Sequence, residues 1–413
     1  MSKNVLLVYP QPGLQKNPRF GFSMQLLQLS SILKKFGTNN FYLDFSYGKY
    51  EKSDFGNFVK NNKIDIIIVE VDTFALKRSE NTENAIEILK ISKELGVKTI
   101  AFGYDCIMDG NSICFADYVV KENPLIQIPQ ILGFTYDISN YDDLPFPDRD
   151  LLLTNEYFKK NEFSTLIRTA EGCLNTCTFC QRRGWQSGYK YHSIEYVLNE
   201  FSLLKSKGYK NIWIVDENFT FNINRAKELL KKIIQNDLTA GMKVAISSWT
   251  RIDFDFLDLA KQANISIISM GIESANPEIL SFYKKDIDLA KTRELIEYAD
   301  SIGIFTVGNF IIGAPIETKI TIHNTFNYII SSKLDQINIK VLDYMIGSVL
   351  YESLEKKEKH HYFGCKENGL CNFSLNELTK LKNDFLKKFY DSKKDYLKNK
   401  INTFGSPYNP MVK

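Results

Sequence analysis

The chain has 413 residues, 44% of them hydrophobic, and this length exceeds what one hydrophobic core usually organises, so two or three packed units are expected. Lysine and arginine number 52 against 49 aspartates and glutamates, a formal charge of +3 with no basic stripe, which does not favour nucleic acid as a partner. Residues 5–9 are too few for a signal-peptide core, and no apolar run approaches the roughly 18 residues of a membrane span, so we expect a cytoplasmic protein. Seven cysteines, an odd number at irregular spacing, argue against a secreted disulfide framework.

The first 135 or so residues alternate short β-rich runs with helical patterns. The β-rich runs lie at residues 5–9, 41–45, 64–71, 98–103 and 118–120, and the helical patterns at residues 24–36 and 82–95. Strands that alternate with helices imply right-handed crossovers and a parallel sheet. We therefore predict an α/β protein whose residues 1–135 form a Rossmann-like domain. A connector rich in proline and aspartate follows at residues 136–160.

A second alternating series begins after the connector. Its predicted strands lie at residues 165–169, 211–216, 243–248, 266–273, 305–312 and 336–343. Ser193 can cap the helix after the first of these strands, and Gly208 can end it. Six such units indicate a partial (β/α)6 barrel over residues 161–350, with its chemistry at the carboxyl ends of the strands. Residues 351–413 are predicted to add a small helical extension, with an amphipathic helix at 375–390 whose charges face solvent.

Three cysteines follow the first strand of this series in a C-x3-C-x2-C arrangement, Cys173, Cys177 and Cys180. Three thiolates in one loop can ligate three irons of a [4Fe-4S] cubane and leave the fourth iron open. A structural zinc site would need a fourth protein ligand, for which the nearby sequence offers only His192. Buried inert thiols are a third interpretation, but this spacing follows no core periodicity. The cysteines are therefore predicted to hold an iron-sulfur cluster.

With these cysteines the chain resembles the radical S-adenosylmethionine superfamily. The resemblance implies two cofactors, the [4Fe-4S] cluster and S-adenosylmethionine, which binds the open iron. It implies that one electron cleaves S-adenosylmethionine to methionine and a 5′-deoxyadenosyl radical. It also implies an external one-electron donor of the flavodoxin or ferredoxin type.

The resemblance extends to acids at the ends of two other strands. At the second strand it implies that Asp216, Glu217 and Asn218 receive the methionine amino group, and at the fourth that Glu273 meets the ribose hydroxyls. Ammonium and hydroxyl groups both need acceptors, which these side chains supply. The alternative is that the acids cap the helices that follow.

Three further residues complete the predicted cofactor site. The resemblance places Phe179 by the adenine and the segment around Gly313 in backbone contact with it, and a glycine lets the backbone approach a flat ring closely. Arg251, after the third strand, either pairs with the methionine carboxylate or lies on the surface.

The whole chain, including residues 144–147 and 389–390, resembles the subgroup that joins a cobalamin-binding-type Rossmann domain to the radical barrel. That subgroup includes methylases of unactivated carbon and anaerobic cyclases of porphyrin biosynthesis. Cobalamin carriers of the methyltransferase type follow their first strand with D-x-H-x-x-G, but residues 9–14 contain neither Asp nor His. A glycine pair is expected after the fourth strand, and only Gly103, followed by Tyr104, is present. Cobalamin is thus a candidate cofactor, and a structural or substrate-binding Rossmann domain is the alternative.

The resemblance implies a radical reaction at a carbon atom of a small molecule, lipid or peptide. C-methylation is expected if cobalamin binds, and a cobalamin-free cyclisation, epimerisation or dehydrogenation is the alternative. A non-catalytic iron-sulfur or zinc protein would not need acids and glycines at the other strand ends. The substrate stays open because specificity lies in loops that the fold does not determine.

Overall fold

The computed structural model describes residues 2–10, 22–45, 52–71, 78–109, 113, 115–153, 164–181, 188–355 and 362–406. The chain divides into two compact units, residues 1–164 and residues 165–412. Among the helices of the described residues, none combines the length and apolar character that a membrane span requires.

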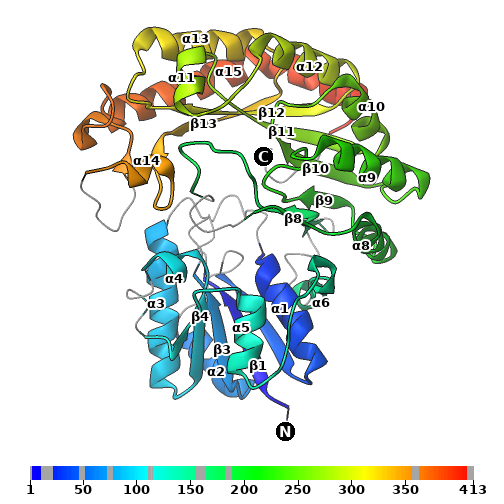
Figure 1. Cartoon of the computed structure of the whole chain (residues 1–413), viewed down its shortest axis with the longest axis vertical. Helices are drawn as coiled ribbons and strands as arrows, with labels where there is room; N and C mark the ends of the chain where they lie inside the picture. Colours follow the sequence, from blue (N-terminus) through cyan, green and yellow to red (C-terminus); the bar gives the residue numbers. More distant parts are fainter. Residues whose placement is uncertain are drawn as a thin grey trace. The chain divides into compact units, whose positions relative to one another are not determined.

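The first unit is a five-stranded parallel sheet with the strand order β2-β1-β3-β4-β5 (Figure 1). Its strands are β1 (Asn4–Tyr9), β2 (Asn39–Asp44), β3 (Ile66–Glu70), β4 (Lys98–Phe102) and β5 (Tyr118–Val119). Its main helices are α1 (Met24–Lys35), α2 (Lys52–Asn61), α3 (Arg78–Glu94), α4 (Tyr104–Asp109) and α5 (Pro124–Ile131). The predicted Rossmann-like sheet is confirmed.

Helices cover both faces of this sheet because the buried strands alternate their side chains between two cores. Val5 and Leu7 of β1 pack with the α1 and α5 side, whereas Leu6 and Val8 pack with the α2 and α3 side. The connector also packs against α1. The buried Asp148 carboxylate accepts a hydrogen bond from Ser30 Oγ at 2.6 Å, so this end of the connector is fixed to the first unit.

The second unit is built on a six-stranded sheet in the order β13-β12-β11-β10-β9-β6, parallel in the pairs from β9 to β13 (Figure 1). Its strands are β6 (Ser164–Ile167), β9 (Asn211–Ile214), β10 (Lys243–Ser248), β11 (Ile265–Glu273), β12 (Phe305–Ile312) and β13 (Gln336–Val341). Its helices are α8 (Ile194–Ser206), α9 (Ile223–Gln235), α10 (Phe254–Gln262), α11 (Pro277–Phe282), α12 (Leu289–Ser301), α13 (Lys319–Ser331), α14 (Val349–Glu352) and α15 (Leu375–Phe404). Two short pairs, β7 (Ala170–Glu171) with β8 (Lys190–Tyr191) and β14 (Asp343–Tyr344) with β15 (Tyr362–Phe363), complete it. The predicted barrel-like order of strands is confirmed.

The two faces of this sheet differ in chemistry. On β11, Ile268, Met270 and Ile272 point into the large core beneath the helices. The intervening positions carry Ser269 and Glu273 on the opposite, inner face. On this inner face Asn309 Nδ2 donates to Ser269 Oγ at 2.9 Å, so a polar row crosses neighbouring strands. The inner face therefore carries this polar row beside the buried apolar cluster of Ala245, Ile267, Phe305 and Val307, whereas the other face packs beneath the helices.

Helix α15 is longer than its prediction. It runs from Leu375 to Phe404, whereas the sequence predicted an end at residue 390. Lys393 and Lys400 of the added turns are buried rather than solvated. Lys400 Nζ lies 2.8 Å from the Asp335 carboxylate and 3.0 Å from that of Asp300. These contacts hold the end of the helix, which lies beyond the residues 375–390 for which solvent-facing charges were expected.

Candidate active site

The three cysteines lie on one loop that follows β7. Cys177 is buried, and Cys173 and Cys180 are half-buried. Asn175 Nδ2 donates a hydrogen bond to Cys173 Sγ at 3.2 Å. In the described part of the chain, no three His, Cys, Asp or Glu side chains converge on a point where one metal ion could bind. A cubane binds each thiolate through a different iron atom, so its ligands do not have to converge in that way.

The start of the cysteine loop has a backbone that only glycine accommodates. Gly172 has φ +93°, and a Cβ atom there would collide with the carbonyl oxygen of Gly188. The Gly172 N–H donates to Glu217 Oε2 at 2.8 Å. Glu217, predicted to receive an amino group, thus also holds the residue immediately before Cys173.

The far side of the loop is tied to the segment that follows α11. Thr178 N–H donates to the carbonyl of Tyr283 at 3.2 Å, and its hydroxyl donates to the carbonyl of Phe282 at 3.0 Å. The ring of Phe179 meets the ring of Tyr283 edge-on, with centroids 5.2 Å apart. Phe179 therefore has a fixed place beside the cysteines, and its proposed contact with adenine stays a prediction.

Asp216 is a buried carboxylate whose oxygens are already occupied. It accepts hydrogen bonds from Thr169 N at 2.7 Å, Thr169 Oγ1 at 2.5 Å and Ala170 N at 3.1 Å. Burial raises the pKa of Asp216 to about 6, against the lowering effect of these donors. These contacts give Asp216 a structural role in joining the end of β6 to the cysteine loop. The acceptance of an amino group by Asp216 or Glu217 stays a prediction.

Asn218 connects the second strand end to the third. Its Oδ1 accepts hydrogen bonds from Thr220 Oγ1 at 3.1 Å and from the backbone N–H of Trp249 at 3.2 Å. Arg251 lies two residues farther on and is exposed, with an ion pair to Asp286 at 2.9 Å. The structure therefore places Arg251 at the surface, which is one of its two predicted positions, and gives Asn218 a positioning role.

Glu273 is held in an unusual conformation at the end of β11. The pairing of β11 with β12 shifts register between Gly271 and Glu273, and Glu273 has φ +65°, a conformation uncommon outside glycine. Its carboxylate pairs with Lys285 Nζ at 3.2 Å, and both side chains are buried. A Cβ atom on Gly271 would lie 2.6 Å from Glu273 Oε1, so the glycine leaves room for the carboxylate. The strained backbone and the buried pair together fix the direction of Glu273.

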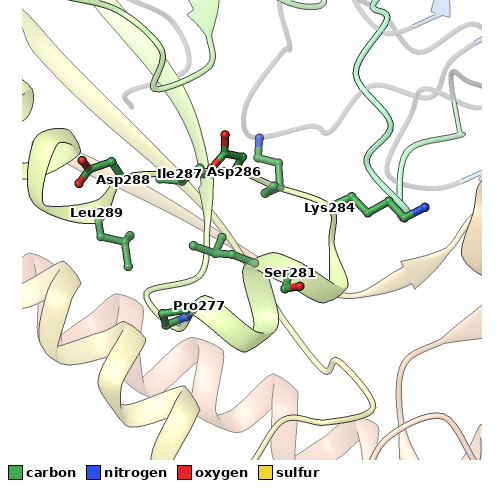
Figure 2. A pocket seen from close by; sticks show the side chains of 9 residues that line it. Pro277, Ser281, Lys284, Asp286, Ile287, Asp288 and Leu289 are labelled. Carbon is green, nitrogen blue, oxygen red and sulfur yellow. The ribbon is translucent and has the colours of Figure 1, made fainter.

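Lys285 is the second buried charged residue at the end of β11, beside Glu273. Its Nζ lies 3.9 Å from the centroid of the Trp249 ring, a distance suited to a cation-π contact. It also lines a cavity of about 780 Å³ formed by α11 and the segment leading to α12 (Figure 2). Burial raises the pKa of the Cys177 thiol to about 12, and the positive charge of Lys285 is the strongest influence opposing that rise. The opposite influence of Glu273 on Cys177 is weaker.

Gly313 is required by backbone packing. It has φ +102°, and a Cβ atom there would lie 2.7 Å from the carbonyl oxygen of Gly364. The N–H groups of Gly313 and Ala314 donate to Glu317 Oε2 at 2.5 and 3.1 Å. Burial raises the pKa of Glu317 to about 7. The predicted contact of the Gly313 segment with adenine stays a prediction, whereas its glycine is explained by the protein alone.

Sequence reasoning missed two residues of this site, Lys285 and Tyr283. A signal for Lys285 was present, because a carboxylate buried at a strand end needs a cation or several donors. The sequence offered several lysines as partners for Glu273, and nothing in their spacing selected one. Tyr283 gave no signal, since an aromatic residue after a helix is usually part of a core.

Comparisons with known proteins agree with this geometry. The sequence profile of the radical SAM superfamily matches residues 167–329, which include the three cysteines and Glu273. The chain is 25% identical over 343 residues to an uncharacterized methyltransferase of Pyrococcus horikoshii, covering 73% of this chain and 71% of that protein. It is 29% identical over 163 residues to the anaerobic magnesium-protoporphyrin IX monomethyl ester cyclase of Cereibacter sphaeroides, covering 38% of this chain and 26% of that enzyme. The match with the cyclase is therefore local.

A solved structure has the same fold across both units. The radical S-adenosylmethionine methyltransferase TsrM from Kitasatospora setae, with cobalamin and a [4Fe-4S] cluster bound, aligns with a TM-score of 0.70. The alignment covers 85% of this chain and 77% of TsrM at 17% sequence identity. At that identity the similarity establishes the shared fold.

Proposed function

The chain is a radical S-adenosylmethionine enzyme, and from this premise we propose that it is a cobalamin-dependent C-methyltransferase. The observation that carries the proposal is the fold, in which a unit with a five-stranded parallel sheet is followed by a unit with a six-stranded sheet, and which is similar to that of TsrM with a TM-score of 0.70. Its superfamily uses a [4Fe-4S] cluster and S-adenosylmethionine. The proposed substrate is a small molecule, lipid or peptide with an unactivated carbon atom.

The chemistry of the donor set fits the cluster. Cys173, Cys177 and Cys180 would hold it, because they lie within eight residues of one loop and thiolates are the ligands that iron-sulfur clusters prefer. The bound cluster supplies the electron that cleaves S-adenosylmethionine reductively. The protein around it fixes the loop at both ends, through Glu217 on one side and the Thr178 contacts on the other. A loop held in this way does not have to be ordered when the cofactor binds.

Two acids would bind S-adenosylmethionine. Glu273 is fixed by Lys285 and has a second oxygen with which to accept from a ribose hydroxyl. Glu217 and Asn218 lie at the end of the second strand, β9, which β10 separates from β11. Glu217 is the proposed acceptor for the methionine ammonium group. Phe179 and the Gly313 segment would lie along the adenine. These side chains would bind and orient the cofactor at the carboxyl ends of the strands, where barrels of this type place their chemistry.

Cobalamin would bind at the carboxyl edge of the first sheet. The strand order β2-β1-β3-β4-β5 changes direction between β1 and β3, and open parallel sheets bind ligands outside the strand ends at such a point. The three loops at this edge are residues 10–22, 72–78 and 104–111, and much of them lies outside the described residues. The first unit contains no histidine, since all four histidines lie beyond residue 190.

A cobalamin-free reaction is the second candidate, and one observation favours it. Gly103 has φ +118°, and a Cβ atom there would lie 2.6 Å from the carbonyl oxygen of Val71, so packing alone explains this glycine. Tyr104, which follows it, is buried with 2% of its surface exposed. A buried tyrosine where a glycine pair would admit a nucleotide tail supports a Rossmann domain without cobalamin.

The deciding experiment combines a binding titration with product analysis. The full chain is reconstituted anaerobically with iron and sulfide, titrated with hydroxocobalamin and followed by its visible absorbance. It is then incubated with S-adenosylmethionine and a strong one-electron reductant. Transfer of the methyl group leaves S-adenosylhomocysteine, whereas reductive cleavage leaves 5′-deoxyadenosine and methionine. S-adenosylhomocysteine that forms only with bound cobalamin supports the methyltransferase, and 5′-deoxyadenosine alone from protein that binds no cobalamin supports the second candidate.

A further inference from the structure

Lys285 is placed by the backbone turn that ends α11. The N–H of Lys285 donates to the carbonyl of Leu280 at 2.8 Å, and the N–H of Lys284 donates to that of Ser281 at 3.0 Å. Lys284 has φ +53°. This pair of bonds around a left-handed residue is the Schellman arrangement that closes a helix carboxyl end. Glycine usually occupies the left-handed position, so the strained Lys284 marks a turn that the surrounding structure holds in place.

The side chain of Lys285 is equally constrained. Its charge is buried, with 2% of the side chain exposed, and it contacts the Glu273 carboxylate at 3.2 Å and the face of Trp249 at 3.9 Å. A buried ammonium needs an opposite charge to offset its desolvation. The neighbouring Lys284 is exposed, and Figure 2 shows its side chain extending away from Asp286. Two adjacent lysines thus differ in burial while carrying the same charge.

The same turn is bonded to the cysteine loop. The carbonyls of Phe282 and Tyr283, just before the two lysines, accept both hydrogen bonds of Thr178, the residue after Cys177. The distance between the Lys285 charge and the loop is therefore set by a few backbone bonds. Lys285 is two residues from Tyr283, so its buried charge is held near the loop that carries Cys177.

We propose that Lys285 is a positioning residue that fixes the Glu273 carboxylate and, through its buried charge, stabilises the reduced form of the cluster held by Cys173, Cys177 and Cys180. The inference rests on the proposed cluster site and adds the way in which the protein sets the cluster's reduction potential. Reduction by one electron adds one negative charge to the cluster, and a fixed cation stabilises that charge strongly where water is excluded. Lys285 makes reduction easier, and Glu273 makes it harder to a smaller extent.

The test is a redox titration of the reconstituted full chain with dithionite, in the absence of S-adenosylmethionine and followed by electron paramagnetic resonance. Lys285→Met should shift the midpoint potential of the cluster to a more negative value, because the buried cation is lost. Glu273→Gln should shift it in the opposite direction, because the cation then acts without its counterion. Lys284→Met, which removes an exposed charge from the adjacent position, should leave the potential unchanged, and Lys285→Arg should stay close to the natural protein.

Equal potentials for Lys285→Met and the natural protein would overturn the proposal, and so would shifts of the same sign in Lys285→Met and Glu273→Gln. If Lys285→Met fails to hold the cluster because Glu273 is left buried without a partner, the double variant Lys285→Met with Glu273→Gln removes both charges. That variant should still have a more negative potential than the natural protein, because the proposal gives the Lys285 charge a larger effect on the cluster than the Glu273 charge. An unchanged potential would overturn the proposal. Iron content, measured on every variant, tests the cluster site separately: a natural chain that binds no iron would contradict the proposed function itself.

Discussion

Gly172 links the conformation of a single residue to the order of the whole cysteine loop. An alanine there would meet the carbonyl oxygen of Gly188 in addition to the strain of φ +93°. We expect Gly172→Ala to lower the iron content of the reconstituted chain markedly, as measured by iron analysis and absorbance. Gly188→Ala is the matched control, because Gly188 also has a positive φ of +86° but has no atom within 4 Å of its Cβ position. It should lose only the roughly 1–2 kcal/mol of backbone strain and keep its iron.

The three cysteines are expected to hold the only cluster. Replacing Cys173, Cys177 and Cys180 together by Ala should reduce the iron content from about four atoms per chain to none, measured after anaerobic reconstitution. Cys365 and Cys371 remain in that variant, but two thiolates fall short of the ligands that a cluster needs. Cys106→Ala is the control, since this buried thiol lies in α4 of the first unit and should not affect iron content. About eight irons in the natural chain would contradict a single cluster.

Glu317 gives the stability of the protein a dependence on pH. Burial raises its pKa from 4.5 to about 7 in the folded chain, so the folded state binds a proton that the unfolded state has already released. The stabilisation is therefore full below about pH 4.5 and is lost as pH rises toward 7, a difference of about 3 kcal/mol. The apoprotein of Glu317→Gln should lose less stability between pH 5 and pH 8 than the natural apoprotein, measured by urea unfolding. Parallel pH profiles for the two proteins would assign the dependence to other groups.

The buried charge of Lys400 holds helix α15 against the base of the barrel. Lys400 Nζ contacts Asp335, Asp300 and the carbonyl of Ile304. Lys400→Met would leave two carboxylates without their cation, and breaking a buried pair on one side typically destabilises a protein by about 3–5 kcal/mol. We expect a clear fall in the thermal unfolding midpoint. Lys398→Met removes an exposed lysine two positions earlier on the same helix and should change the midpoint little.

Helices α8 and α15 show which features of the fold the sequence could predict. Helix α8 was predicted within two residues, because Ser193 accepts from Tyr196 N–H as an N-cap and Gly208 takes the left-handed conformation after its end. The last turns of α15 were not predicted, because Lys393 and Lys400 look like solvent-facing residues until Asp300 and Asp335 are brought to them by the fold. Local patterns specify caps and periodicity, whereas a buried ion pair depends on residues distant in sequence.

The residues of the candidate site likewise differ in whether the sequence could predict them. The C-x3-C-x2-C spacing is local and identified the cysteine loop from sequence alone. The direction of Glu273 depends on a register shift in β11 and on Lys285, and neither is visible in a hydrophobic pattern. Thr169, which follows β6 and donates hydrogen bonds to Asp216, could not be predicted as its partner for the same reason.

The two proposed functions differ in whether the first unit takes part in the reaction of the second. The second unit carries the residues 167–329 that match the radical SAM superfamily and the groups proposed to bind S-adenosylmethionine. The first unit has the strand order of a ligand-binding domain, and two hydrophobic cores pack the faces of its sheet. In a cobalamin-free enzyme this domain would serve stability or substrate binding, whereas in a methyltransferase it would hold the cobalamin that carries the methyl group. Cobalamin binding by the intact chain therefore distinguishes the two proposed functions.

Any cobalamin bound by the first unit should lack a protein imidazole below its cobalt, because residues 1–164 contain no histidine. The electron paramagnetic resonance spectrum of the cobalt(II) form should therefore show no splitting from a protein imidazole nitrogen, and growth on ¹⁵N-histidine should leave the spectrum unchanged. If the buried Tyr104 obstructs the nucleotide tail, Tyr104→Gly should bind cobalamin more tightly than the natural chain in the absorbance titration. Tyr118→Gly, at an exposed tyrosine of the same sheet, is the control for the loss of a ring. A chain that binds no cobalamin with either residue at position 104, yet converts S-adenosylmethionine to 5′-deoxyadenosine, would end the methyltransferase proposal in favour of the cobalamin-free radical reaction.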